Sequence, residues 1–191
     1  MSARGKFNVD NMQVLVSPER SQAIDTDALL SGLPISPSDV VADVGCGPGF
    51  LTLPLARYLT EGRVHALDIQ QAMLDAVQRS LDAEGLTNAE VALSTENRLP
   101  LAGHTLDGAF LAFVLQEAHS PDALLIEVQR CLKDDGWLAV LEWHKRDMDY
   151  GPPVARRIDP DTMDAKLRTL GYQTPKRREL NADQYLMITR S

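Results

Sequence analysis

The residues best suited to chemistry begin with the stretch VVADVGCGPGF, residues 40–50. A short run of small apolar residues, typical of a buried strand, ends in a turn with glycines at positions 45, 47 and 49. Glycine permits unusual backbone angles and lets a ligand approach the main chain closely, and a helix after the turn would present free N–H groups. The pattern predicts a ligand-binding turn, with tight packing between strand and helix as the alternative interpretation.

The spacing of the glycines separates classes of ligand. A dinucleotide fingerprint has the spacing G-x-G-x-x-G, whereas this chain has G-x-G-x-G followed by Phe50. A phosphate-binding loop needs Gly-Lys-Ser or Gly-Lys-Thr after its first glycine, and the turn has neither. Neither of these two phosphate-binding patterns is therefore present.

A second candidate is Asp68 in the stretch HALDIQ, 19 positions beyond Gly49 (68 − 49). It ends an expected strand, and a carboxylate at the end of a second strand can accept both hydroxyl groups of a ribose. The alternative is that Asp68 caps a helix expected from residue 70, and both roles can hold together.

The framework that must position these residues alternates β-like runs with amphipathic ones. We expect strands at residues 40–45, 63–68, 89–94, 106–113 and 136–143, and two more near 172–179 and 184–189. We expect helices at residues 18–31, 51–59, 72–81, 121–132 and 160–170. The alternation predicts an α/β fold with a doubly wound, mostly parallel sheet and helices on both faces. In such a fold, ligands bind at the carboxyl ends of the strands.

The composition narrows the class of protein. With 191 residues, 44% of them hydrophobic and 24% charged, the chain is expected to form one globular domain. No run approaches the roughly 20 apolar residues of a membrane-spanning helix, and the first residues lack the apolar core of a secretory signal. The net charge of −8 argues against nucleic acid, and the basic stretches 156–157 and 176–178 are interpreted as solvated surface charge.

The two cysteines, Cys46 and Cys131, lack the spacing of metal ligands, and no H-E-x-x-H is present. We therefore expect no metal. Two reduced thiols predict a cytoplasmic location.

The glycine turn also carries a resemblance, because it matches the pattern D-x-G-C-G-x-G. The matching residues are Asp43, Gly45, Cys46, Gly47 and Gly49. Over residues 38–143 the chain resembles the class I S-adenosylmethionine-dependent methyltransferases, and more narrowly their ubiquinone/menaquinone-biosynthesis type, the type 11 domains. The resemblance implies S-adenosylmethionine (AdoMet) as cofactor. It also implies a seven-stranded Rossmann-like sheet with an antiparallel last strand.

The resemblance assigns roles in cofactor binding. The glycine turn would hold the methionine part of AdoMet, with Asp43 anchoring its ammonium directly or through water. Asp68 would bind the ribose hydroxyls, and Ile69 would lie against the adenine.

A third stretch, STENRLPL at residues 94–101, resembles the family's segment after the third strand. Thr95 falls where the family often has an aspartate that accepts from the adenine amino group. The polar contact is therefore left to Thr95, Glu96 or Asn97.

In a fourth stretch the family reads L-H-H, and this chain has Gln116 and Glu117 in place of the histidines. Methyl transfer from a sulfonium is largely positioning, with proton removal from the acceptor where needed. Glu117 and His144 are the candidate proton acceptors, and Trp143 and Tyr150 the candidate apolar walls of an acceptor pocket. The alternatives are a helix cap for Glu117, a loop histidine for His144, and aromatic packing on the last helix.

The sequence thus predicts a single domain over residues 1–191, with a lead segment (1–37), a cofactor-binding core (38–143) and an acceptor side (144–191). The predicted function is methyl transfer from AdoMet to an unidentified, small-molecule acceptor. One alternative is an AdoMet-binding module without activity that acts through a partner, and another is a nucleotide-cofactor oxidoreductase. The sequence predicts no oligomeric state.

Overall fold

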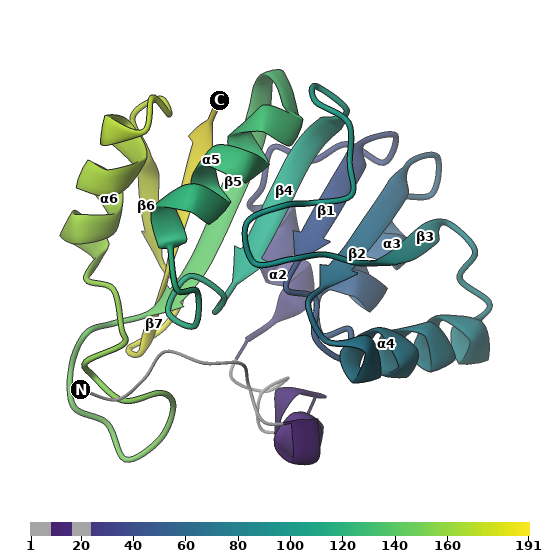
Figure 1. The fold of residues 1–191 in the computed structure, drawn as a ribbon, viewed down its shortest axis with the longest axis horizontal. Helices are drawn as coiled ribbons and strands as arrows, with labels where there is room; N and C mark the ends of the chain where they lie inside the picture. Colours follow the sequence, from purple (N-terminus) through teal and green to yellow (C-terminus); the bar gives the residue numbers. More distant parts are fainter. Residues whose placement is uncertain (1–8, 17–23) are drawn as a thin grey trace.

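A seven-stranded sheet forms the centre of the computed structural model, which describes residues 9–16 and 24–191 (Figure 1). Its strands are β1 (Val40–Val44), β2 (Arg63–Asp68), β3 (Ala89–Leu93), β4 (Leu106–Ala112), β5 (Leu132–Trp143), β6 (Lys176–Glu179) and β7 (Gln184–Arg190). Strands β1 to β5 pair in parallel, and β7 runs antiparallel to β5 and β6. The predicted fold class is therefore confirmed.

The strand order β3-β2-β1-β4-β5-β7-β6 decides where a ligand can bind. Strands β1 and β4 are neighbours in the sheet, although β2 and β3 lie between them in the sequence. The chain winds toward one edge from β1 and toward the other from β4, so the connections diverge at the carboxyl ends of these two strands. A crevice at such a switch point is the general binding place of open α/β sheets.

Helices cover both faces of the sheet (Figure 1). They are α2 (Thr26–Ser31), α3 (Thr52–Tyr58), α4 (Gln71–Glu84), α5 (Pro121–Cys131) and α6 (Pro160–Thr169), and a 3₁₀ helix, η1 (Val9–Val16), precedes them. Buried side chains of α2, α3 and α4 belong to one core, and those of α5 and α6 belong to the other. None of the described helices is long and apolar enough to cross a membrane.

Strand β5 connects the two cores because its side chains alternate between them. Trp137, Ala139 and Leu141 belong to the core under α2, α3 and α4. Leu138 and Val140 belong to the core under α5 and α6. Successive side chains of a strand point to opposite faces, so the run from Trp137 to Leu141, which is buried on both faces, is apolar throughout.

Several predicted boundaries differ from the structure. The lead helix predicted at residues 18–31 begins at Thr26, because the side chain of Asp25 caps it by accepting the N–H of Ala28 at 2.9 Å. Residues 17–23 lie outside the described part of the chain. Strand β5 begins at Leu132 rather than at residue 136, and η1 was not predicted from the sequence.

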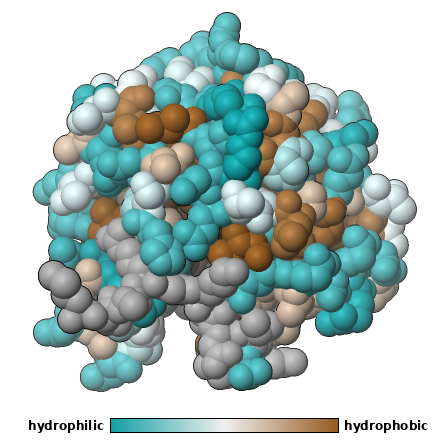
Figure 2. Space-filling model, in the orientation of Figure 1, coloured by the Kyte–Doolittle hydropathy of each residue, from teal (hydrophilic) through white to brown (hydrophobic). Residues whose placement is uncertain are grey.

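The surface is mainly hydrophilic on the face drawn in Figure 2, with small, separate groups of apolar side chains. Leu93 on β3 and Ile126 on α5 are about half exposed, at 54% and 53%. Scattered apolar residues of this kind are normal on monomeric proteins, so they do not by themselves indicate a binding surface.

Candidate active site

A cavity of about 600 Å³ opens at the carboxyl edge of the sheet. This volume is typical of small-molecule sites. Each of the strands β1 to β5 contributes residues from its carboxyl end or from the segment that follows it, and η1 adds Val14 and Leu15. These residues are 44–48 and Phe50 for β1, 68–70 and Met73 for β2, 94–96 for β3, 112–114, 116–118 and Leu124 for β4, and Trp143, 151–153 and Arg156 for β5. The cavity therefore lies at the switch point of the fold.

The three glycines of the turn have different structural roles. All three have positive φ, at 72° for Gly45, 53° for Gly47 and 104° for Gly49. A Cβ on Gly45 would lie 2.4 Å from Val114, and one on Gly49 would lie 2.5 Å from Leu53. A Cβ on Gly47 would meet nothing closer than 3.6 Å. Packing therefore explains Gly45 and Gly49, whereas Gly47 opens toward the cavity.

Asp68 ties the glycine turn to the start of α4. Its Oδ2 accepts the N–H of Gly47, and its Oδ1 accepts the N–H of Gln70, both at 2.9 Å. Gln70 is the N-cap of α4, so Asp68 binds the residue at the helix end and is not itself the cap. Each carboxylate oxygen has a further acceptor direction, and Asp68 lines the cavity. It can therefore hold the turn and a ribose together.

Asp43 lies behind the turn. It is 2% exposed, its Oδ2 accepts the hydroxyl of Thr52 at 2.6 Å, and it is not among the residues that line the cavity. The sequence-based expectation of direct contact with an ammonium therefore gains no support from this placement. Burial, followed by the charges of Asp43 and Asp68, raises the pKa of Cys46 well above its usual range. Cys46 lines the cavity as a neutral thiol.

Two of the three candidate polar residues after β3 line the cavity, and one does not. Thr95 and Glu96 line the cavity, whereas Asn97 is exposed and does not. The Thr95 hydroxyl donates to the carbonyl of Arg98 at 3.4 Å, and Glu96 pairs with Nδ1 of His119 at 2.9 Å. Ile69, the residue expected against the adenine, also lines the cavity.

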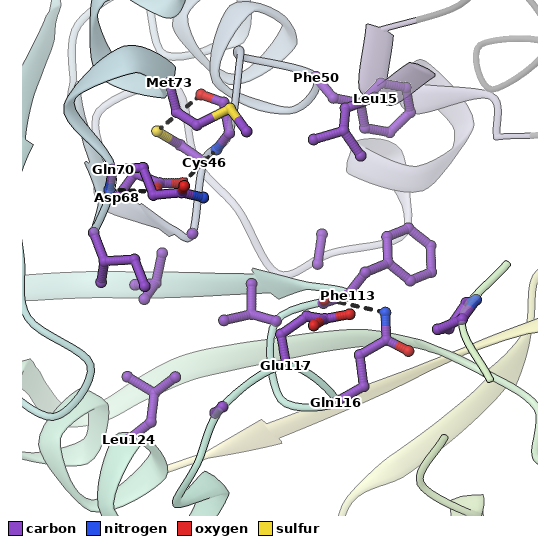
Figure 3. Close-up of a pocket in the computed structure, with 18 of the residues that line it drawn as sticks. Leu15, Cys46, Phe50, Asp68, Gln70, Met73, Phe113, Gln116, Glu117 and Leu124 are labelled. Carbon is purple, nitrogen blue, oxygen red and sulfur yellow. Dashed lines mark hydrogen bonds between the residues drawn. The ribbon is translucent and has the colours of Figure 1, made fainter. Parts of the chain in front are cut away.

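The opposite side of the cavity holds Gln116 and Glu117, next to Phe113 and across from Asp68 and Cys46 (Figure 3). Glu117 Oε2 accepts from Arg156 Nη1 at 3.0 Å. Burial raises the pKa of Glu117, and the positive charge of Arg156 opposes that rise. The result is a half-buried carboxylate with one cationic partner at the cavity wall.

His144 is not brought to the cavity, which corrects its candidate role as a proton acceptor there. Its Nε2 pairs with Glu179 at 2.6 Å, in a second depression formed with Asp161 of α6. Trp143 is the neighbouring residue and does line the cavity. Successive residues of an extended strand face opposite ways, so the end of β5 can send only one of the two side chains to the cavity.

Tyr150 is likewise not among the residues that line the cavity. It is 57% exposed, its hydroxyl donates to Asp183, and its ring meets the edge of Trp143 at 5.9 Å. Tyr150 therefore supports the wall that Trp143 forms, from the outside.

The loop between β5 and α6 is fastened by Arg157. This side chain is 3% exposed and donates to the carbonyls of Pro152, Arg146 and Tyr150 at 2.7–2.9 Å. The interpretation of residues 156–157 as solvated surface charge is therefore wrong. Arg156 faces the cavity and Arg157 holds the loop that carries it.

Several cavity residues were not selected from the sequence as site residues. They differ in whether any feature of the sequence could have identified them. Gln116 was visible only as a departure from the family pattern, and Arg156 only as half of a basic pair. Leu15 of η1, whose Cδ1 is the first atom that a Cβ on Gly47 would meet, had no sequence signal because its position depends on long-range packing.

Glu142 is a buried carboxyl beneath this wall. It is 0% exposed, and its Oε1 accepts the N–H groups of Leu115 at 3.0 Å and Gln116 at 3.4 Å. Burial raises the pKa of Glu142 to about 8. The neutral carboxyl therefore holds the backbone turn after β4 at pH 7.

The fold, the glycine turn and the acidic residue after β2 are those of Rossmann-like domains that bind an adenosine-containing cofactor. Residues 41–136 match the family model described as a methyltransferase domain. The chain belongs to this family, and its fold is that of the class I AdoMet-dependent methyltransferases. AdoMet is the cofactor of the family, and the open Gly47 position and the carboxylate of Asp68 fit it.

Similar proteins support this assignment. The chain is 36% identical to the ubiquinone/menaquinone biosynthesis C-methyltransferase UbiE of Teredinibacter turnerae, over 61% of this chain and 47% of that protein. It is 32% identical to the demethylmenaquinone methyltransferase of Lactobacillus johnsonii, over 58% and 46% of the two chains. The chain thus spans about half the length of these curated relatives.

Among solved structures, a SAM-dependent methyltransferase from Aquifex aeolicus is similar with a TM-score of 0.93 and 28% identity. The similarity covers 97% of this chain and 99% of that one. The whole described architecture, including the segment after β5, therefore has a counterpart.

We expect Asp68→Ala to weaken the binding of S-adenosylhomocysteine by about 1.5–3 kcal/mol, the scale of hydrogen bonds to a charged group. The variant also leaves the N–H groups of Gly47 and Gln70 without this acceptor. Isothermal titration calorimetry measures the change. Asp75→Ala on the exposed side of α4 is the matched control and should bind as the unchanged protein does. Equal affinity in both variants would remove Asp68 from the cofactor site.

Glu142 should make the protein less stable as the pH rises. Its pKa is about 8 in the folded protein and 4.5 as the reference value, so above pH 4.5 the unfolded chain releases a proton that the folded chain keeps until about pH 8. The stability that this carboxyl contributes is complete below pH 4.5 and is lost as the pH rises from 4.5 to about 8, on the order of 5 kcal/mol in all. Glu142→Gln mimics the neutral form and should flatten that slope.

Urea unfolding at pH 5 and pH 9 measures the effect. Glu127→Gln is the contrasting control, because the hydrogen bond from Arg130 lowers the pKa of Glu127. Its contribution is present above pH 4.5 and is lost at lower pH. A Glu142→Gln variant with the same alkaline loss as the unchanged protein would show that Glu142 is ionised in the fold.

Proposed function

We propose that this chain transfers a methyl group from AdoMet to a small molecule bound on the Gln116 side of the cavity. The observation that carries the proposal is that one cavity joins two unlike walls. Asp68 and the Gly47 turn form one wall, and Gln116 and Glu117 form the other (Figure 3). The relatives whose names refer to ubiquinone, menaquinone and demethylmenaquinone support a largely apolar acceptor.

When bound, AdoMet supplies a methyl group on a sulfonium that is already activated for displacement. Asp68 would accept hydrogen bonds from the ribose hydroxyls while it keeps its two backbone N–H partners. Ile69 would lie against the adenine, and Thr95 or Glu96 would bind a polar group of that ring. Cys46 and Gly47 leave room for the methionine part, and Asp43 fixes the turn from behind through Thr52.

On the other wall, Glu117 would take the proton that the acceptor releases on methylation, with S-adenosylhomocysteine as the leaving group. Burial raises the pKa of Glu117, which makes it a better base than an exposed carboxylate. Arg156 holds the carboxylate in place through Oε2, and Trp143 with Phe113 provides apolar cover. Aromatic contact joins these two rings at 5.2 Å.

The single-domain organisation over residues 1–191 and the cytoplasmic location remain predictions from the sequence. The predicted location agrees with two buried, free cysteines.

The assignment of the cofactor site is tested by thermal unfolding with ligands. S-adenosylhomocysteine at about 100 times its Kd should stabilise the protein by about 2.7 kcal/mol through mass action, which corresponds to a rise in Tm of roughly 5–10 °C for a chain of this size. NAD should give no shift, because the glycine spacing is not that of a dinucleotide site. Stabilisation by NAD alone would contradict the assignment.

Glu117→Gln should reduce kcat by about 100-fold or more, the lower end of general base catalysis, and change the affinity for S-adenosylhomocysteine by less than about threefold. In the unchanged protein the rate should rise with pH as Glu117 ionises. A panel of phenols, quinone precursors and amines with labelled AdoMet provides the assay. Glu61→Gln, an exposed carboxylate between α3 and β2, is the control. Full turnover in Glu117→Gln would assign the base elsewhere, and cofactor binding with no turnover on any acceptor would favour a binding module.

A further inference from the structure

Gln116 is a buried, uncharged polar side chain in the cavity wall. It is 4% exposed and lines the cavity, as do the apolar residues Phe113, Leu124 and Trp143. Within the described residues, its Oε1 has no hydrogen-bond partner. An amide oxygen buried without a partner is destabilising, so its position at a cavity wall is explained by a ligand that supplies the donor.

The orientation of this amide is fixed by its neighbours. Nε2 of Gln116 donates to the carbonyl of Phe113 at 3.3 Å (Figure 3). A carbonyl can only accept, so rotation of the amide by a half turn would set two oxygens against each other. The backbone N–H of Gln116 is held at the same time by the buried carboxyl of Glu142. Oε1 is therefore presented in a single orientation.

The charges on this wall cancel. Among the described residues that line the cavity, Glu117 and Arg156 are the charged ones on the Gln116 side, and they form an ion pair with each other. The remaining wall consists of apolar side chains such as Phe113, Trp143 and Leu124. A charged acceptor would need Glu117 or Arg156 as its partner and would have to break their ion pair, whereas an uncharged acceptor leaves that pair intact.

We propose that Gln116 determines acceptor specificity: its Oε1 accepts a hydrogen bond from a hydroxyl or N–H group of an uncharged, largely apolar acceptor. This inference rests on the proposed function, because it concerns the acceptor half of the same cavity. A site that is built to bind such a group discriminates strongly against an analogue that lacks it, because the buried oxygen is then left unsatisfied. Glu117 lies beside Gln116, so the group that binds Oε1 is close to the proposed base.

Three probes of equal ring size test the inference by equilibrium dialysis against protein saturated with S-adenosylhomocysteine. 2-Naphthol carries a hydroxyl, 2-methylnaphthalene replaces it with a methyl group, and 2-naphthoate carries a negative charge. We expect 2-naphthol to bind at least about tenfold more tightly than either of the others. Gln116→Met, which keeps the length of the side chain, should reduce the preference for 2-naphthol over 2-methylnaphthalene to less than about threefold, and Gln116→Leu should do the same.

Leu124→Met is the matched control on the same wall, and it should shift the affinities for 2-naphthol and 2-methylnaphthalene together. Equal binding of these two probes to the unchanged protein overturns the inference, as does a preference that persists in Gln116→Met, tighter binding of 2-naphthoate, or no binding of any probe. The same dialysis reports S-adenosylhomocysteine. Its failure to bind would overturn the proposed function, whereas its binding without a hydroxyl preference would overturn only the role of Gln116.

Discussion

The site depends on one carboxylate, that of Asp68, which holds two backbone turns together. The carbonyl of the preceding residue, Leu67, accepts the N–H groups of Gly45 at 2.7 Å and Cys46 at 2.9 Å. The carboxylate of Asp68 then accepts the N–H of Gly47. Consecutive N–H groups of the glycine turn are thus bound to the end of β2, and the other carboxylate oxygen binds the start of α4. The shape of the cofactor wall follows from the parallel pairing of β1 with β2.

The sequence predicted best those features of the fold and site that depend on local sequence pattern. Apolar runs with turn signals identified the strands, and a parallel sheet brings their carboxyl ends to one edge. Asp68 and the glycine turn were found because their spacing from the strand ends is short. The position of Asp43 was not predictable in the same way. Its strand gives its register, but the buried hydrogen bond from Thr52 to its carboxylate is visible only in the structure.

The acceptor side was less predictable. It is built by the loop between β5 and α6 and by the end of β5, where successive side chains point in opposite directions. Both Trp143 and His144 follow from the sequence as residues after β5, but a shift of one residue exchanges their directions. The loop itself is ordered by Arg157, whose three carbonyl partners lie 5 to 11 residues away in the sequence. Such contacts have no local signature, so Arg156 could not be assigned to the cavity.

The two walls of the cavity are fixed in different ways, and the difference suits their tasks. The cofactor wall is built on the backbone of the glycine turn, which one carboxylate, that of Asp68, ties to the start of α4. The acceptor wall is made of side chains that hold one another. Arg156 orients Glu117, while Phe113 and Glu142 orient Gln116. Because these groups are positioned before a ligand arrives, little ordering cost remains for binding. Substitutions on this wall can therefore change the acceptor while the cofactor wall stays intact.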